Sequence, residues 1–215
     1  VGDEKKCDIT NDDVGSNLTV VKVVVNDNNG TKQVSDFPLF INGSGVTSGV
    51  SIAVNAGDYL VSETGQVGYG SSFSGDCNSS GVVVVGLSQN KTCTITNNDI
   101  QPKLTLIKHV TNDNGGNAVV SDFPLFVDGG SVTSGVAVEV TANAEHTASE
   151  TTQFGYAPSA WGGGCAADGT ITLLPGDEKT CTVTNDDITS NLTVIKVVVN
   201  DNGGTKQVSD FPLFV

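Results

Sequence analysis

Three lysines lie at the centre of apolar segments that otherwise have the composition of β-strands. They are Lys22 in LTVVKVVV, Lys108 in LTLIKHVT and Lys196 in LTVIKVVV. Because side chains alternate across a strand, each lysine shares a face with the leucine that opens its segment. A lysine buried without compensation costs several kcal/mol or loses its proton and becomes a nucleophile. The sequence therefore predicts a partner for each amine.

Candidate partners follow from the same alternation. Glu63 in DYLVSET and Glu150 in HTASET share a face with small or apolar neighbours. Asn97 in TITN and Asn185 in TVTN do so near the end of each repeat. Each complete domain thus offers one inward lysine, one inward glutamate and one inward asparagine.

Internal repeats define the elements that must position these groups. The block NLTVVKVVVNDNNGTKQVSDFPLFI returns twice in related form, and a closing block occurs as KKCDITNDD, KTCTITNND and KTCTVTNDD. We expect a piece of a longer tandem array with short linkers. The predicted division is a tail of a preceding repeat (1–16), two complete repeats (17–102 and 103–190) and the head of a following repeat (191–215).

Short apolar segments separated by turn residues fill each repeat, and no helical periodicity is present. This pattern is typical of an all-β chain of tandem immunoglobulin-like β-sandwich domains. In the first repeat we expect seven strands, at 18–25, 37–41, 46–54, 58–63, 67–73, 82–86 and 91–97.

The five cysteines follow the repeats. Cys77 and Cys93 have the same spacing as Cys165 and Cys181, which predicts one disulfide in each complete domain. Cys7 aligns with Cys93, so we expect its partner upstream. A zinc site is the rival interpretation, but two cysteines without a nearby histidine supply too few ligands. Disulfides predict a location outside the cytoplasm.

Charge and composition exclude several classes of function. The chain has 10 Lys and Arg against 24 Asp and Glu, a net charge of −14, which repels nucleic acids and anionic lipids. No segment is apolar over the length needed to span a bilayer, so we expect no membrane span. No nucleophile–base pair or phosphate-binding loop indicates an enzyme that turns over.

The order of Lys22, then YLVSETGQVGYG, then TITN resembles the prealbumin-like domain of Gram-positive surface proteins and pilins, the B-type repeat of collagen adhesins. HTASETTQFGYA and TVTN repeat the pattern in the second domain. The resemblance covers essentially the whole chain and implies a prealbumin-like β-sandwich. It also implies an intramolecular isopeptide bond, in which the lysine amine attacks the asparagine carboxamide with assistance from the glutamate.

By position, the resemblance assigns two complete sets and two halves. They are Lys22, Glu63 and Asn97; Lys108, Glu150 and Asn185; and Asn11 and Lys196, whose partners would lie outside residues 1–215. Fixed proximity makes one slow turnover feasible without another enzyme. The alternative is a buried ion pair hydrogen-bonded by asparagine, without covalent chemistry, in domains that the disulfide closes instead.

Weaker signals concern metals. The turns NDNNG and NDNGG place Asp27, Asp113 and Asp201 where oxygen ligands could collect calcium, but Asn-Gly and Gly-Gly favour the interpretation as tight turns. No other cofactor is expected. His109 and His146 are isolated and are interpreted as strand residues rather than ligands.

These observations predict a structural protein of the cell surface, a stalk, fibre or filament shaft of stapled domains. Its partners would be neighbouring repeats or identical chains in a fibre. The alternative is an adhesin that binds a surface ligand of unknown identity through its variable loops, 64–81 and 151–169.

Overall fold

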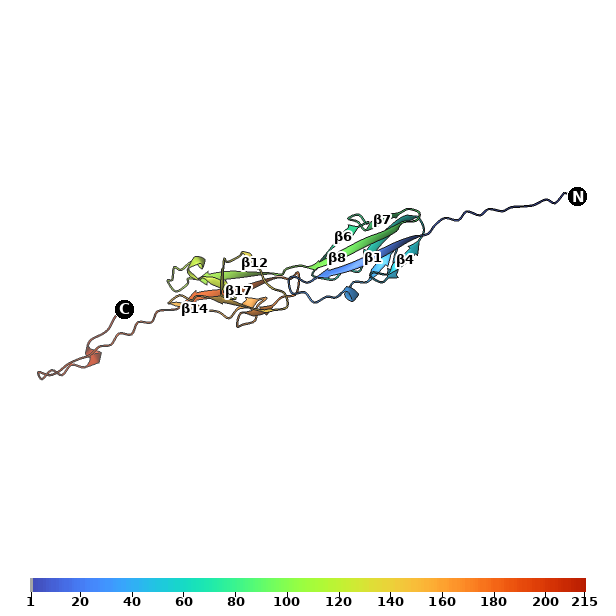
Figure 1. Ribbon diagram of the computed structural model, residues 1–215. Coiled ribbons are helices and arrows are strands. Elements are labelled where there is room, and N and C mark those ends of the chain that lie inside the picture. The colour runs from blue at the N-terminus through green and yellow to red at the C-terminus, as the bar shows by residue number, and fades with distance from the viewer. Residues whose placement is uncertain (1) are drawn as a thin grey trace.

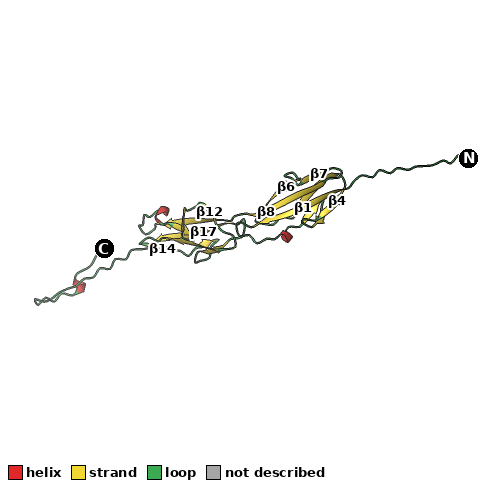
Figure 2. Cartoon of the chain, in the orientation of Figure 1, coloured by secondary structure: helices red, strands yellow, loops and turns green. Residues whose placement is uncertain are grey.

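Two β-sandwiches follow one another along an elongated molecule (Figure 1). The structure is a computed structural model that describes residues 2–215. The first sandwich runs from Ser16 to Asp99 and the second from Lys103 to Asp187. Segments 2–15 and 188–215 lie outside the sandwiches, where Figure 2 shows loop apart from the 3-10 turn η3 (Val208–Asp210). The all-β, tandem-sandwich architecture predicted from the sequence is confirmed.

The first sandwich has two four-stranded sheets, ordered β4-β1-β8-β6 and β3-β2-β5-β7. Its elements are β1 (Ser16–Val25), η1 (Val34–Asp36), β2 (Leu39–Ile41), β3 (Ser44–Val46), β4 (Ser51–Val54), β5 (Gly57–Glu63), β6 (Tyr69–Gly75), β7 (Val82–Val85) and β8 (Asn90–Asp99). Side chains from both sheets form one core that includes Leu18, Val61 and Ile95.

The second sandwich repeats this plan with sheets ordered β12-β9-β17-β14 and β11-β10-β13-β16, and β15 also pairs with β17. Its elements are β9 (Lys103–Thr111), η2 (Val120–Asp122), β10 (Leu125–Val127), β11 (Gly130–Val132), β12 (Ala137–Glu139), β13 (Glu145–Glu150), β14 (Tyr156–Pro158), β15 (Gly162–Gly163), β16 (Thr170–Thr172) and β17 (Glu178–Asp187). The core includes Leu104, Leu173 and Val183.

The first and last strands of each sandwich are neighbours and run parallel. In the first sandwich β1 pairs with β8 along nine positions, with Lys22 opposite Ile95 and Val24 opposite Asn97. In the second, β9 and β17 pair in the same way, with Lys108 opposite Val183. Lysine and asparagine therefore lie on adjacent strands, two residues apart along the ladder and on the same face.

One strand expectation needs correction. The sequence predicted a single strand over 46–54, but β3 ends at Val46 and β4 begins at Ser51, in the other sheet. The chain turns between them at Gly49, whose φ of +77° favours glycine and whose N–H donates to the Val20 carbonyl at 2.8 Å. The apolar alternation continues across this turn because both short strands face the same core.

The recurring SDFPLF motif forms the link between the two sheets. In the first sandwich Asp36 accepts the Gln33 N–H at 2.7 Å and closes the 3-10 turn η1. Phe37 follows the turn and is buried. Asp122 and Phe123 make the same arrangement after Val119. The motif thus places one aromatic ring inside each sandwich.

Candidate functional site

The first sandwich brings Lys22, Glu63 and Asn97 together in its interior. The Lys22 amine lies 2.7 Å from Glu63 Oε2 and donates a short hydrogen bond to Asn97 Oδ1. The side chains of Lys22 and Glu63 are 0% and 7% exposed, and Asn97 is fully buried. These groups come from β1, β5 and β8, so the site joins the first strand, the opposite sheet and the last strand.

The second sandwich contains the same arrangement. The Lys108 amine lies 2.5 Å from Glu150 Oε2 and 2.5 Å from Asn185 Oδ1. Lys108 and Asn185 are buried. Two independent sites with one geometry indicate that the repeat sequence specifies the constellation.

Burial lowers the pKa of both lysines. Removal from water lowers the pKa of Lys22 below its ordinary value, and the hydrogen bond and charge of Glu63 offset this only in part. The pKa of Lys108 is lowered for the same reasons, with Glu150 as the offsetting group. A lowered pKa increases the fraction of the amine that is neutral and therefore nucleophilic.

The carboxamide nitrogens of Asn97 and Asn185 are the unsatisfied donors of these sites, where carboxylate oxygens of Glu63 and Glu150 also lack a hydrogen-bond partner within residues 2–215. Both Nδ2 atoms are buried, and neither has a hydrogen-bond partner among the described residues. Leaving a buried donor unpaired costs about 1–3 kcal/mol. Loss of this NH2 group as ammonia, with the lysine nitrogen in its place, would remove that cost.

An aromatic ring covers each amine, a contact that alternation along the sequence does not predict. The Phe37 ring centroid lies 4.4 Å from Lys22 Nζ, and the Phe123 centroid lies 4.7 Å from Lys108 Nζ. Tyr69 and Tyr156 pack edge-on against these rings, at 5.5 and 5.3 Å between centroids. The identity of SDFPLF in three copies was the available signal. The rings exclude water while they stabilise the cation.

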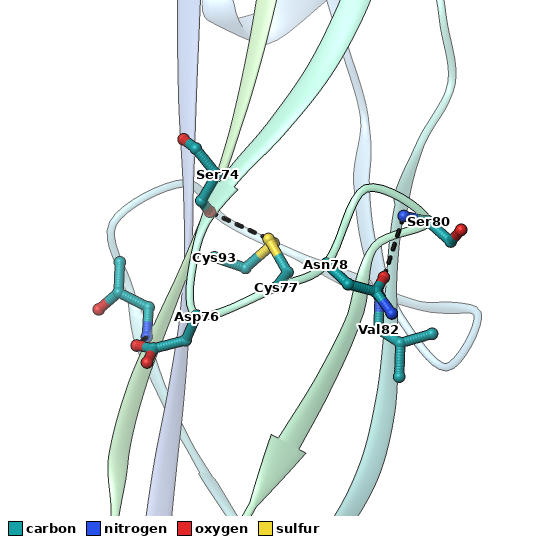
Figure 3. The surroundings of a disulfide bond; sticks show 8 residues. Ser74, Asp76, Cys77, Asn78, Ser80, Val82 and Cys93 are labelled. Atoms are coloured by element: carbon teal, nitrogen blue, oxygen red, sulfur yellow. Dashed lines mark hydrogen bonds between the residues drawn. A yellow bond between two sulfur atoms is a disulfide. The ribbon is translucent and has the colours of Figure 1, made fainter.

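Each sandwich also contains one disulfide, Cys77–Cys93 in the first and Cys165–Cys181 in the second. Figure 3 shows the first, which ties the loop after β6 to β8, the strand that carries Asn97. In this loop Asn78 Oδ1 accepts the backbone N–H groups of Ser80 and Val82 at 2.9 and 3.0 Å. The disulfide therefore fixes the asparagine-bearing strand on its core face, where Cys93 is buried beside Ile95 and Asn97.

The residues that the sequence predicted as halves of further sites lie in the terminal segments. Cys7 is an exposed free thiol, and Asn11 is exposed. Lys196 is half-buried, and its amine lies 4.7 Å from the Phe211 ring centroid. The segment after Asp187 thus already has the lysine–phenylalanine contact of the complete sandwiches.

The three aspartates predicted as weak calcium ligands have different surroundings in the structure. Asp113 lies in an acidic cluster with Asp186 and Asp187, whereas Asp27 and Asp201 belong to no such cluster among the described residues. The Asp187 carboxylate instead accepts backbone N–H groups of Asp113, Asn114 and Gly116 at 2.5–3.0 Å.

Desolvation raises the pKa of Asp187, but these hydrogen bonds outweigh it and lower the pKa overall. In the first sandwich Asp99 makes the equivalent contacts with the N–H groups of Asn28 and Gly30. The aspartates therefore have a structural role, since each holds the turn that follows the first strand.

Comparison with family models identifies the family of these two domains. A model described as the prealbumin-like fold domain matches residues 13–95 and 99–183. The chain belongs to this family. The resemblance inferred from the lysine, glutamate and asparagine motifs is thereby confirmed, and each match spans one of the two prealbumin-like domains of the structure.

Comparison with solved structures finds matches that include the following three. The Bacillus anthracis TIE protein has a TM-score of 0.43 at 16% identity, over 82% of this chain and 34% of that protein. The major pilin protein T-13 of Streptococcus pyogenes has 0.31 at 11%, over 84% of this chain and 98% of that one. A single B repeat unit of the collagen binding surface protein of Staphylococcus aureus has 0.23 at 16%, over 82% and 99%.

The chain thus spans about a third of the length of the TIE protein structure. Comparison with curated protein sequences finds no match. Within residues 2–215, no helix of the prealbumin-like domains or their flanking segments has the length and apolarity that crossing a membrane requires.

Proposed function

We propose that this chain is part of the shaft of an extracellular surface filament or stalk, and that an isopeptide bond closes each complete domain. The bonds join Lys22 to Asn97 and Lys108 to Asn185. The observation that carries the proposal is the pair of buried, unpartnered Asn Nδ2 atoms beside lysines of lowered pKa. A purely hydrogen-bonded triad leaves these donors unsatisfied, whereas bond formation removes them.

The reaction needs no group from outside the domain. Glu63 or Glu150 takes a proton from the neighbouring ammonium, and the neutral amine forms a bond to Cγ of the asparagine. The bond from Cγ to Nδ2 then breaks. The lysine nitrogen gives up two of its three protons: one converts the leaving NH2 to ammonia, and the other passes to solvent. Each chain carries out this reaction once per domain, so it is not an enzyme that turns over.

The strand order supports a mechanical role. Because β1 and β8 run parallel, the start of β1 and the end of β8 lie at opposite ends of the ladder (Figure 1). Tension along the chain therefore loads this ladder in shear. With a bond between Lys22 and Asn97, the load passes from β1 directly into β8, and the segment between these residues stays unloaded.

The extracellular location is part of the proposal. Two disulfides in two domains are typical of proteins that fold outside the reducing cytoplasm. Neighbouring repeats or further copies of the chain are the partners that a shaft requires.

Single-molecule pulling from the two ends tests the proposed function. We expect neither domain to release its internal segment, so that the force–extension curve lacks unfolding steps of whole-domain length. A variant with Lys22→Met and Lys108→Met is the matched control and should show both steps. Whole-domain steps in the unmodified protein would contradict a load-bearing crosslink.

Ligand binding through loops is the second candidate function, and one observation favours it. The loop regions differ between domains: β6 is a continuous strand of seven residues, whereas β14 and β15 are short and separate. If segment 151–169 binds a surface ligand, grafting it in place of 64–81 should double the number of binding sites per chain. A graft without added binding would exclude this segment as the binding element.

A further inference from the structure

The two domains meet in a joint built from a small number of hydrogen bonds. The Ala142 N–H donates to the Asn28 carbonyl at 3.2 Å, and Asn29 Nδ2 donates to the Ala142 carbonyl at 2.7 Å. Asn143 Nδ2 donates to the Asn29 carbonyl at 2.8 Å. We call residues 141–143 of the second domain the joint loop. Its three hydrogen bonds to the first domain all involve two residues of that domain, Asn28 and Asn29.

A histidine holds this loop from inside the second domain. His146 lies on β13 and is 6% exposed. Its Nε2 lies 2.8 Å from the carbonyl oxygen of Thr141, the first residue of the joint loop. Its Nδ1 lies 2.6 Å from Asp128 Oδ2, in the turn between β10 and β11.

Both partners of His146 are acceptors. A carbonyl oxygen can only accept a hydrogen bond, and so can an ionised carboxylate. The geometry therefore fits an imidazolium, which donates from both ring nitrogens. A neutral ring leaves one nitrogen lone pair facing an oxygen, and one of the two contacts becomes repulsive.

From this geometry we infer that protonated His146 fixes the joint loop, so that the relative order of the two domains depends on pH. The device lies outside the lysine–asparagine sites and does not depend on their covalent state. It gives the second domain, through its own histidine, a pH-dependent contribution to stiffness at the joint.

The charged surroundings favour the imidazolium. Asp128 is in direct contact, and Glu139 of β12 lines the same shallow cavity as His146. Glu145 precedes His146 on β13 but is exposed, on the other face. The neighbouring strands β10, β11 and β16 contribute no titratable side chain. The charges that contact His146 or line its cavity are thus negative, and the basic Lys103 of β9 pairs opposite Glu139 on the exposed face.

The direction of the pH effect follows. Burial alone lowers the pKa of His146, but the hydrogen bonds to Asp128 and Thr141 and the charge of Asp128 raise it overall. A histidine with a raised pKa contributes its stabilisation below the ordinary value of about 6.5 and loses it as pH rises through the folded value. The joint loop is therefore held below the ordinary pKa of histidine and released as the pH rises through the raised pKa of His146.

The first domain supplies a matched control, because it solves the same problem without a titrating histidine. There Tyr59 Oη donates to the Asn55 carbonyl at 3.0 Å, and Asn42 Oδ1 accepts the Leu60 N–H at 2.9 Å. In the second domain Asp128 Oδ1 accepts the Thr147 N–H in the same way. The pair Asn42–Tyr59 thus corresponds to Asp128–His146.

The test measures domain alignment by residual dipolar couplings in the full chain, from about pH 5 to about pH 9. At the acid end both domains should report alignment tensors of equal magnitude, and these should diverge as the His146 ring signal titrates. The exposed His109 is an internal reference for the ring signals. The variant Asp128→Asn/His146→Tyr, which copies the first domain, should show no divergence with pH.

Two results would overturn the inference. One is equal tensors in the unmodified chain at every pH while His146 titrates. The other is the same pH-dependent divergence in the double variant. If the double variant does not fold, His146→Gln replaces it, because glutamine also lacks a titration in this range and should likewise give pH-independent tensors.

Discussion

At the scale of single residues, the lysine amines are defined by what surrounds them. Lys22 and Lys108 each face a carboxylate, a carboxamide oxygen and an aromatic ring. The carboxylate offsets the cost of burying the charge, and the ring keeps water away. In this environment the lysine loses its proton more easily than in water, and its amine lies beside the carboxamide carbon of one asparagine.

Removing one carboxylate should stop the reaction in one domain only. In Glu150→Gln the amide cannot accept the lysine proton, so we expect crosslinking of the second domain to slow by about 100-fold or more. Intact mass should then show one ammonia lost instead of two. The first domain, with Glu63 unchanged, is the control within the same chain. Loss of two ammonias at the normal rate would show that the glutamate has no part in the reaction.

The lowered lysine pKa values predict a pH dependence when the amines stay free. In Asn97→Ala/Asn185→Ala no bond can form. An unfolded lysine keeps its proton up to about pH 10.4, so between the lowered folded pKa and this value the unfolded state binds more protons. The free energy of unfolding should therefore rise with pH in this window, by up to about 1.4 kcal/mol per pH unit for each lysine.

Urea unfolding at several alkaline pH values measures this slope. Adding Lys22→Met and Lys108→Met to the same background removes the titrating groups and should remove the slope. A free energy of unfolding that falls with pH over the window, relative to this control, would contradict the lowered pKa values.

At the scale of elements, each disulfide and each triad act on the same strand. β8 carries both Cys93 and Asn97, and β17 carries both Cys181 and Asn185. Neighbouring strands pair with β8 and β17 on both edges, and each disulfide adds a covalent link from the same strand to a loop earlier in the domain. The two links therefore reinforce one element instead of closing separate parts of the domain.

Loss of one disulfide should lower the stability of its own domain. For Cys165→Ser/Cys181→Ala we expect a decrease of about 3 kcal/mol, the value typical of a loop of this length. Trp161, the single tryptophan, packs on the second core and reports unfolding by fluorescence. The matched variant Cys77→Ser/Cys93→Ala should change this signal much less. Equal effects on Trp161 fluorescence would mean that the domains unfold as one unit.

Most elements could be predicted because the alternation of apolar residues has a period of two in every copy. The strand predicted over 46–54 was wrong because the chain changes sheets at Gly49 without interrupting that alternation. The parallel pairing of β1 with β8 could not be predicted either, since residues far apart in sequence leave no local signal of their register.

For the site, alternation selects Lys22, Glu63 and Asn97 as inward residues, and the structure brings them together. Alternation gives no distances, and it does not indicate which aromatic ring covers the amine. Phe37 reaches Lys22 only because the 3-10 turn η1 redirects the chain after β1. The role of His146 depends on a loop that contacts another domain, which a single repeat cannot reveal.

At the scale of the whole molecule, the joint decides whether the domains form a rod or a flexible chain. Gly68, with a φ of +80°, lies where an added Cβ would collide with the Pro175 carbonyl, so this position requires glycine. The Ile100 N–H donates to the Gly68 carbonyl at 2.8 Å, and the Gly176 N–H donates to the Ile100 carbonyl at 2.7 Å. The linker is thus bonded to both domains.

Removing one side chain should loosen this joint. Asn29 has a φ of 69°, and Gly115 is its counterpart in the second domain, so Asn29→Gly keeps the backbone while it deletes the bond to Ala142. We expect a smaller maximum dimension in X-ray scattering, because a flexible joint samples bent arrangements. Asn42→Gly, which changes another asparagine of positive φ away from the joint, is the control. Identical scattering from the two variants would exclude a role for Asn29 in stiffness.

Covalent bonds between Lys22 and Asn97 and between Lys108 and Asn185 are central to the proposed shaft. Intact mass of the reduced, denatured chain tests them most directly, because reduction removes the disulfides and leaves an isopeptide bond in place. We predict a mass below that of the amino-acid sequence by two ammonias. A mass equal to that of the plain sequence would contradict both bonds and leave each triad as a buried ion pair.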